Sequence, residues 1–231
     1  MQLKGLFRLT TRRKEILEEL KTIGSGKTFD ALLPPLIFVI INSVSGLDIA
    51  VTAAVGFALV FGMIRLLRKQ TWQYALGGLL GVILASGLAY LTRSAAGYFI
   101  PAIISSTLLY LSALISIFIG KPIAAWASHL TRGWPLEWFW RKDIKPAYME
   151  VTWFWAGFFA TRMAIQIILY QSGDAAMLAW ANILIGWPVT IIVLIITYVY
   201  GIWRLRRLGG PGVDEYKEGK EPPWQGQTRG F

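Results

Sequence analysis

The sequence has no cysteine, and His129 is the single histidine among its 231 residues. The absence of cysteine excludes disulfides and thiol catalysis, and one histidine argues against a histidine-built zinc site. Charged residues are scarce at 16%, whereas a typical soluble domain has about 25%. No Ser-His-Asp or paired-carboxylate arrangement occurs in the apolar segments, so we expect neither an enzyme nor a bound cofactor.

Hydrophobic residues are abundant instead, at 55% of the chain, and they gather in six continuous blocks. Crossing about 30 Å of hydrocarbon takes roughly 20 helical residues, and continuous rather than alternating blocks favour helices over strands. The blocks cover residues 32–44, 49–67, 74–91, 96–119, 151–170 and 177–203, and the first is the shortest. We therefore predict an all-α fold, a polytopic membrane helix bundle with about six transmembrane helices.

The 23 lysines and arginines lie almost entirely in alternate gaps between these blocks. They occupy the N-terminal segment, the gaps after the second and fourth blocks, and the tail, whereas Arg93 is alone on the other side. Such a bias marks the cytoplasmic side of a membrane protein. The sequence therefore predicts a multi-pass protein with both termini in the cytoplasm. The net charge of +10 then reflects topology, and we expect no nucleic-acid partner.

The predicted spans form a six-helix transmembrane domain at 31–204. Three segments of the chain are not spans, and one of them, 121–150, lies within that domain. Residues 1–30 are basic and predict an uncleaved, cytoplasmic amphipathic helix. Residues 121–150 combine tryptophans with cations and predict an interfacial helix along the membrane surface. Residues 205–231 have too little apolar content to fold alone and predict a flexible tail. The interfacial face, with anionic lipid headgroups as its expected partners, comprises Trp126, Trp134, Trp138, Trp140, Arg141 and Lys142.

Arg162 is a cation near the middle of the fifth block, and no Asp or Glu lies at that depth in any block. A cation inside a bilayer costs at least about 2.5–3.5 kcal/mol, so Arg162 must face protein, water or a ligand. Two interpretations stay open: a structural arginine held by carbonyls and amides, or a site for an anion or a lipid headgroup. The candidate polar site comprises Arg162, Gln166, Asn182, Asn42 and Thr190.

Small residues recur every four positions in the second and third blocks. Small side chains on one face let two helix backbones approach closely within a membrane. We therefore predict helix packing through Gly77, Gly81, Ala85, Ala54, Ala58 and Gly62. In the sixth block, Pro188 removes one backbone hydrogen bond, so we expect either a kink or a broken-helix binding site there.

Several stretches resemble a known family. They are residues 92–101, Gly120-Lys121-Pro122, residues 140–143 with Ala147-Tyr148, residues 155–159 with Arg162 and Gln166, and Gly186-Trp187-Pro188. Together they resemble domain of unknown function 3159 (DUF3159) over residues 32–203, which implies a six-span protein of the bacterial plasma (inner) membrane. Lys121-Pro122 and residues 155–159 are also distantly similar to the intracellular septation protein A family, which is associated with envelope integrity and cell division.

These features lead to three functional hypotheses. The first is a non-enzymatic membrane protein that acts in scaffolding or in envelope and membrane homeostasis through its tryptophan-rich cytoplasmic face. The second is a small transporter or channel for an anion or a lipid, with its site at Arg162. The third is an accessory subunit of a larger membrane complex. A homo-oligomer is compatible with each of them.

Overall fold

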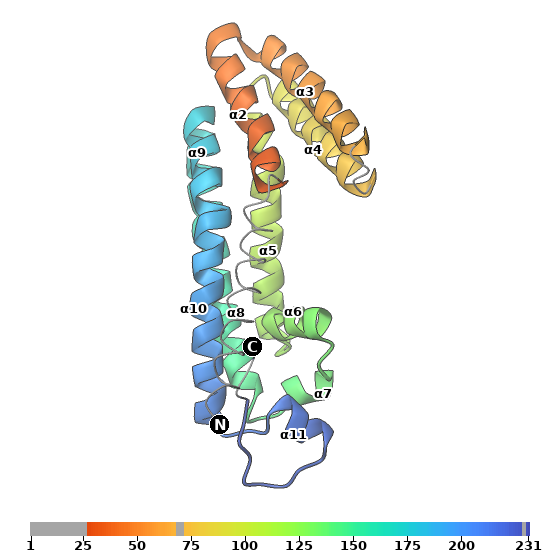
Figure 1. Ribbon diagram of the computed structural model, residues 1–231. Helices are drawn as coiled ribbons and strands as arrows, with labels where there is room; N and C mark the ends of the chain where they lie inside the picture. Colours follow the sequence, from red (N-terminus) through yellow and green to blue (C-terminus); the bar gives the residue numbers. More distant parts are fainter. Residues whose placement is uncertain (1–26, 68–71, 228–229) are drawn as a thin grey trace, which may run out of the picture. The chain divides into compact units, whose positions relative to one another are not determined.

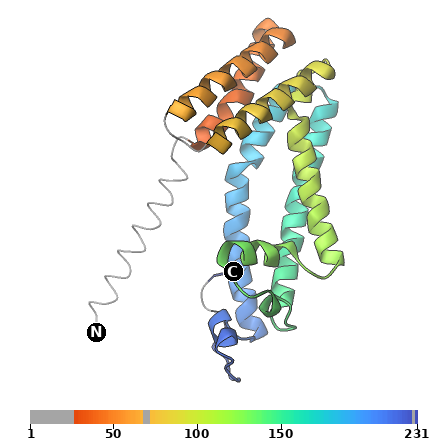
Figure 2. The same ribbon diagram turned by 90° about the vertical axis from the view of Figure 1, so that its right-hand side faces the viewer.

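The computed structural model describes residues 27–67, 72–227 and 230–231 (Figures 1 and 2). All regular structure in those ranges is helical, so the predicted all-α class is confirmed. The chain divides into an N-terminal unit, Met1–Tyr98, and a C-terminal unit, Phe99–Phe231. The amphipathic helix predicted for residues 1–30 falls mostly outside the described residues.

The N-terminal unit contains three helices, α2 (Lys27–Ser45), α3 (Leu47–Leu67) and α4 (Trp72–Leu91). Gly46 makes the turn between α2 and α3 at a φ of +82°, a conformation that glycine adopts without strain. Helix α3 packs against both α2 and α4. The short 3₁₀ helix η1 (Ala95–Phe99) follows α4, and within it the Tyr98 ring stacks on Phe38 with the centroids 4.2 Å apart.

Alanines rather than glycines make the close helix contacts of this unit. The buried small residues are Ala54, Ala58 and Ala85, as predicted, together with Ala50 and Ala89. Gly77 and Gly81 are exposed, and a Cβ placed at either of them would meet no atom within 4 Å. A Cβ placed at Gly62 would also meet no atom within 4 Å. Within this unit the predicted packing role therefore does not fit Gly62, Gly77 and Gly81, because the helices approach along the alanine-bearing faces.

In the C-terminal unit the longest helix is α8 (Lys145–Gln171), which packs against α5 (Ile100–Phe118), α9 (Ala175–Ile185) and α10 (Trp187–Leu208). Asp174 caps α9, since its Oδ1 accepts a 2.9 Å hydrogen bond from the Met177 N–H. The predicted sixth span is two helices, because Gly186 leaves the helical conformation at ψ −118° just before Pro188. Proline has no N–H to continue the preceding helix and fits the first turn of a new one.

Four helical segments of the described chain are long and apolar enough to cross a membrane. They are Leu47–Leu67, Ala95–Phe118, Lys145–Gln171 and Ala175–Leu208. Two apolar helices are shorter, Leu33–Ser45 and Leu76–Leu91. These six segments coincide with the six apolar blocks, so the membrane-type helical character is confirmed. The count of six crossings stays a prediction.

Three short helices gather where α8 begins and α10 ends (Figure 1). They are α6 (Ile123–Arg132), α7 (Leu136–Phe139) and α11 (Val213–Lys217). We call residues 123–144, 209–227 and 230–231, which include these three helices, the aromatic cap. A single interfacial helix over 121–150 is wrong, because Gly133 ends α6 at a φ of +67° and α8 begins already at Lys145. The flexible tail is also wrong, because residues 209–227 fold back onto the bundle.

Candidate functional site

The aromatic cap has a core of buried rings. Trp138, Phe139 and Tyr148 have no exposed surface. The Phe139 ring meets Trp138 at 5.0 Å between centroids and Tyr148 at 4.9 Å, in both cases edge to face, as aromatic quadrupoles favour. Phe231 lies flat on Tyr148, with the centroids 4.3 Å apart. These rings come from α7, α8 and the tail, so they join three separate segments of the chain.

Hydrogen bonds hold the tail against this core. The Trp138 Nε1–H donates a buried 2.9 Å bond to the carbonyl oxygen of Pro211. The Glu215 carboxylate accepts 2.8 Å bonds from the backbone N–H groups of Gly212 and Gln225. Because these bonds stabilise the charged carboxylate, they hold the pKa of Glu215 below its usual value. The tail is therefore a folded part of the cap.

The tail approaches the bundle closely at Gly201 on α10. This glycine is buried, and any Cβ at its position would overlap the Phe231 ring. The absence of a side chain at Gly201 is thus a requirement for Phe231 to reach Tyr148. The sequence pattern offered no sign of this role, because a glycine within an apolar block looks the same whether or not a ring lies over it.

An ion pair joins α8 to α10 beside the cap. Arg204 donates from Nε and Nη2 to the two carboxylate oxygens of Glu150 at 2.8 and 2.9 Å. The Tyr200 hydroxyl donates a 2.6 Å bond to the same carboxylate. The side chains of Arg204 and Glu150 are 30% and 33% exposed, so the pair sets the register of the two helices more than it adds stability. Sequence analysis missed it, because the partners are 54 residues apart.

The four tryptophans predicted to form a membrane-facing surface have different surroundings. Trp138 is fully buried, and Trp134 and Trp140 pack against the core of the cap. Trp126, by contrast, is 38% exposed. His129 closes the turn between α6 and α7, where its Nδ1 lies 2.6 Å from the Trp134 carbonyl oxygen. Since a carbonyl can only accept, Nδ1 carries the proton.

The two cations of the predicted face also differ. Arg141 makes an ion pair with Asp143 at 2.7 Å, and its guanidinium lies 5.2 Å from the centroid of the Trp224 ring. Lys142 is exposed. The prediction of one shared interfacial face is therefore wrong for Trp138, and it stays a prediction for the other five residues. The Trp138 ring is buried more completely in the core of the cap than it would be at a headgroup surface.

The structure brings two residues of the candidate polar site into contact. Gln166 on α8 is 1% exposed, and its Nε2 donates a 2.7 Å hydrogen bond to Oδ1 of Asn182 on α9. Asn182 in turn donates from Nδ2 to the Leu178 carbonyl at 2.8 Å. Arg162 is half-buried one turn before Gln166. Its buried Nε has no hydrogen-bond partner within the described ranges, and none of the ion pairs there includes it.

The remaining two members of that site are on other helices. Thr190 is half-buried on α10, and its N–H donates to the Gly186 carbonyl at 3.0 Å. Asn42 is half-buried on α2 and belongs to the N-terminal unit, where its carbonyl accepts from the N–H of Gly46 at 3.2 Å. The polar cluster of the C-terminal unit is thus Arg162 with the Gln166–Asn182 pair.

An all-helical fold with four segments of membrane-spanning length and a folded aromatic cap defines a helical membrane protein. The chain belongs to the DUF3159 family, described as proteins of unknown function, whose model matches residues 24–206. That match ends before α11 and the rest of the tail. No curated protein and no solved structure matches the chain. The similarity to the intracellular septation protein A family stays a prediction.

Proposed function

We propose that this chain is a non-enzymatic protein of the bacterial inner membrane that scaffolds or maintains the envelope, with the aromatic cap in the cytoplasm. The observation that carries the proposal is the buried core of the cap, which fixes the exposed groups Trp126 and Lys142 in place. A preorganised surface loses less conformational entropy on binding than a mobile segment does. The lysines and arginines concentrated in residues 121–150 and in the tail support the cytoplasmic placement.

The exposed surface of the cap can be altered without disturbing its core. The double variant Trp126→Ala/Lys142→Glu removes an exposed ring and inverts an exposed charge. In cells that lack the wild-type protein, we expect this variant to reach normal abundance in the membrane but to leave the envelope sensitive to detergent. Plating efficiency on detergent and an immunoblot of the membrane fraction are the two measurements.

The matched control for this variant is Trp180→Ala/Arg93→Glu, which makes the same chemical changes at exposed positions outside the cap. It should restore detergent resistance fully. Full restoration by the cap variant at normal abundance would refute a scaffold that acts through this surface.

A second candidate function is the transport of an anion or of a lipid headgroup. The observation that favours it is the buried Arg162 Nε without a partner, beside the Gln166–Asn182 pair. A guanidinium that retains a donor inside a bilayer can bind an oxyanion. This function places the site within the bundle, whereas the scaffold acts through the cap.

Substitution of Arg162 distinguishes the two functions. For a structural arginine in a scaffold, we expect Arg162→Ala to lower the abundance of the protein severalfold, because truncating this half-buried side chain leaves a void inside the bundle. Arg162→Lys should restore part of that abundance. Membrane immunoblots and phosphate uptake by proteoliposomes measure the two effects, with Arg207→Ala, at an exposed position, as the control. Normal abundance combined with lost uptake would favour transport over the scaffold.

A further inference from the structure

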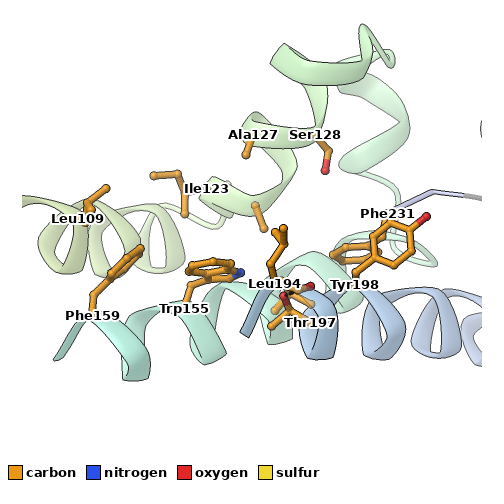
Figure 3. A pocket seen from close by; sticks show the side chains of 12 residues that line it. Leu109, Ile123, Ala127, Ser128, Trp155, Phe159, Leu194, Thr197, Tyr198 and Phe231 are labelled. Carbon is orange, nitrogen blue, oxygen red and sulfur yellow. Dashed lines mark hydrogen bonds between the residues drawn. The ribbon is translucent and has the colours of Figure 1, made fainter. Parts of the chain in front are cut away.

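An apolar cavity of about 300 Å³ lies in the C-terminal unit between α6 and the helices α5, α8 and α10 (Figure 3). Ile123 and Ala127 of α6 lie on one side of it, and Trp155 and Phe159 of α8 lie on the other. Phe231 contributes from the tail. No Asp, Glu, Lys or Arg is among the lining residues.

The chemistry of this lining selects an apolar occupant. Its hydroxyl groups include those of Ser128 and Thr197, and Thr197 Oγ1 already donates a 2.7 Å bond to the Val193 carbonyl. A charged group placed here would lose its hydration without finding an opposite charge, which is costly. The volume equals roughly ten waters at about 30 Å³ each and lies at the lower end for small-molecule pockets, so a single narrow chain fits it.

The cavity lies a short distance inside the basic end of the bundle. Its lining residues on α8, Val151 to Phe159, are roughly 9 to 21 Å along the helix axis from Lys145. Those on α10, Leu194 to Tyr198, are roughly 9 to 15 Å from Arg204. Because half of the hydrocarbon layer is about 15 Å thick, cations at the headgroup level would place the cavity at the depth of the acyl chains.

A cation lies beside this cavity. Arg132, at the end of α6, is exposed, and its guanidinium lies 5.9 Å from the ring centroid of Tyr198, which lines the cavity. The same guanidinium lies 4.9 Å from the centroid of Trp134, so two rings hold it in position. The ion pairs within the described ranges do not include Arg132, which leaves its charge open to an anionic group.

We propose that the cavity takes one acyl chain of an anionic phospholipid, whose headgroup phosphate lies beside Arg132. The apolar lining accounts for the chain, and the ring-held guanidinium accounts for the anionic headgroup. The proposal rests on the membrane placement of the C-terminal unit, which labelling of single cysteines on either side of α8 tests separately. It does not depend on the scaffold function, because a bound lipid is compatible with either proposed function.

Photolabelling tests this site directly. The probe is phosphatidylglycerol with a diazirine on one acyl chain, present at a low mole fraction in phosphatidylcholine vesicles that contain the full chain. We expect label in the α6 and α10 segments that line the cavity, and unlabelled phosphatidylglycerol should displace it. Ala127→Trp fills the cavity from α6, so the label there should fall about tenfold or more. Keeping only two methylene groups of the acyl chain out of the cavity already weakens binding by about that factor.

Ala164→Trp is the matched control, because Ala164 is exposed on α8 and does not line the cavity. It should keep the cavity label. Label confined to other lipid-facing segments of the wild type, or unchanged in Ala127→Trp, would overturn the proposal.

Arg132→Gln gives an independent test, since Arg132 is exposed and its loss leaves the buried core intact. We expect the preference for phosphatidylglycerol over phosphatidylcholine to fall about fivefold, the factor that one cation near a membrane surface contributes. Arg132→Lys should retain most of the preference. An unchanged preference in Arg132→Gln would refute the assignment of the headgroup.

Discussion

Replacing Trp138 with alanine is expected to lower the free energy of unfolding of the C-terminal unit by about 3–5 kcal/mol, the usual cost of truncating a buried aromatic residue. Trp138 has no exposed surface and packs against Phe139 and Tyr148, so its removal opens a void between α7 and α8. It also leaves the buried Pro211 carbonyl without its donor. Denaturation in mixed micelles and hydrogen exchange of residues 209–227 measure the global and the local loss.

Two further substitutions separate the causes of this loss. Trp138→Phe keeps most of the ring volume but removes the Nε1–H, so it should cost about 1–3 kcal/mol from the unsatisfied carbonyl. Trp126→Ala removes the same type of side chain at an exposed position, and it should lower the free energy of unfolding much less than Trp138→Ala does. Equal losses for Trp138→Ala and Trp126→Ala would show that the cap has no buried core around Trp138.

Single cysteines placed on either side of α8 should react from opposite sides of the membrane. The natural chain has no cysteine, so Lys142→Cys and Ser172→Cys each create one exposed thiol, in the cap and in the turn after α8. Helix α8 has 27 residues and is roughly 40 Å long, more than the hydrocarbon thickness of about 30 Å. In intact cells, we expect an impermeant maleimide to label Ser172→Cys fully and Lys142→Cys only after lysis.

The same experiment locates the tail. Lys217→Cys lies on α11, which belongs to the cap, so it should behave as Lys142→Cys does and stay unlabelled until lysis. Equal labelling at positions 142 and 172 in intact cells would show that α8 does not cross the membrane. If position 142 reacted in intact cells and position 172 reacted only after lysis, α8 would cross the membrane in the opposite orientation to the one proposed.

The cap shows how a correct reading of composition can lead to a wrong structure. Tryptophans beside cations predict an interfacial surface when each residue is taken by itself. In the structure, Trp138 turns inward because Gly133 and Pro135 allow α7 to fold back, and the tail supplies Val213 and Phe231 to complete the core. The tail is too polar to fold alone, and it folds by packing on apolar residues that other segments provide.

Part of the polar cluster near the middle of α8 could be predicted from the sequence. Arg162 and Gln166 share a face at helical spacing, which is a local property of one helix. That the Gln166 amide donates its hydrogen bond to Asn182 could not be predicted, because this bond depends on how α9 packs against α8.

The amino-acid sequence by itself determined the helical class, the apolar blocks, the family and the one-sided distribution of cations. These follow from local properties: a helix satisfies its own backbone hydrogen bonds, and a span needs only sufficient apolar length. The tertiary structure decided that Trp138 meets Pro211 across 73 residues, that Glu150 meets Arg204 across 54, and that an apolar cavity lies beside Arg132. Such contacts depend on the relative position of whole helices, which no single stretch of sequence specifies.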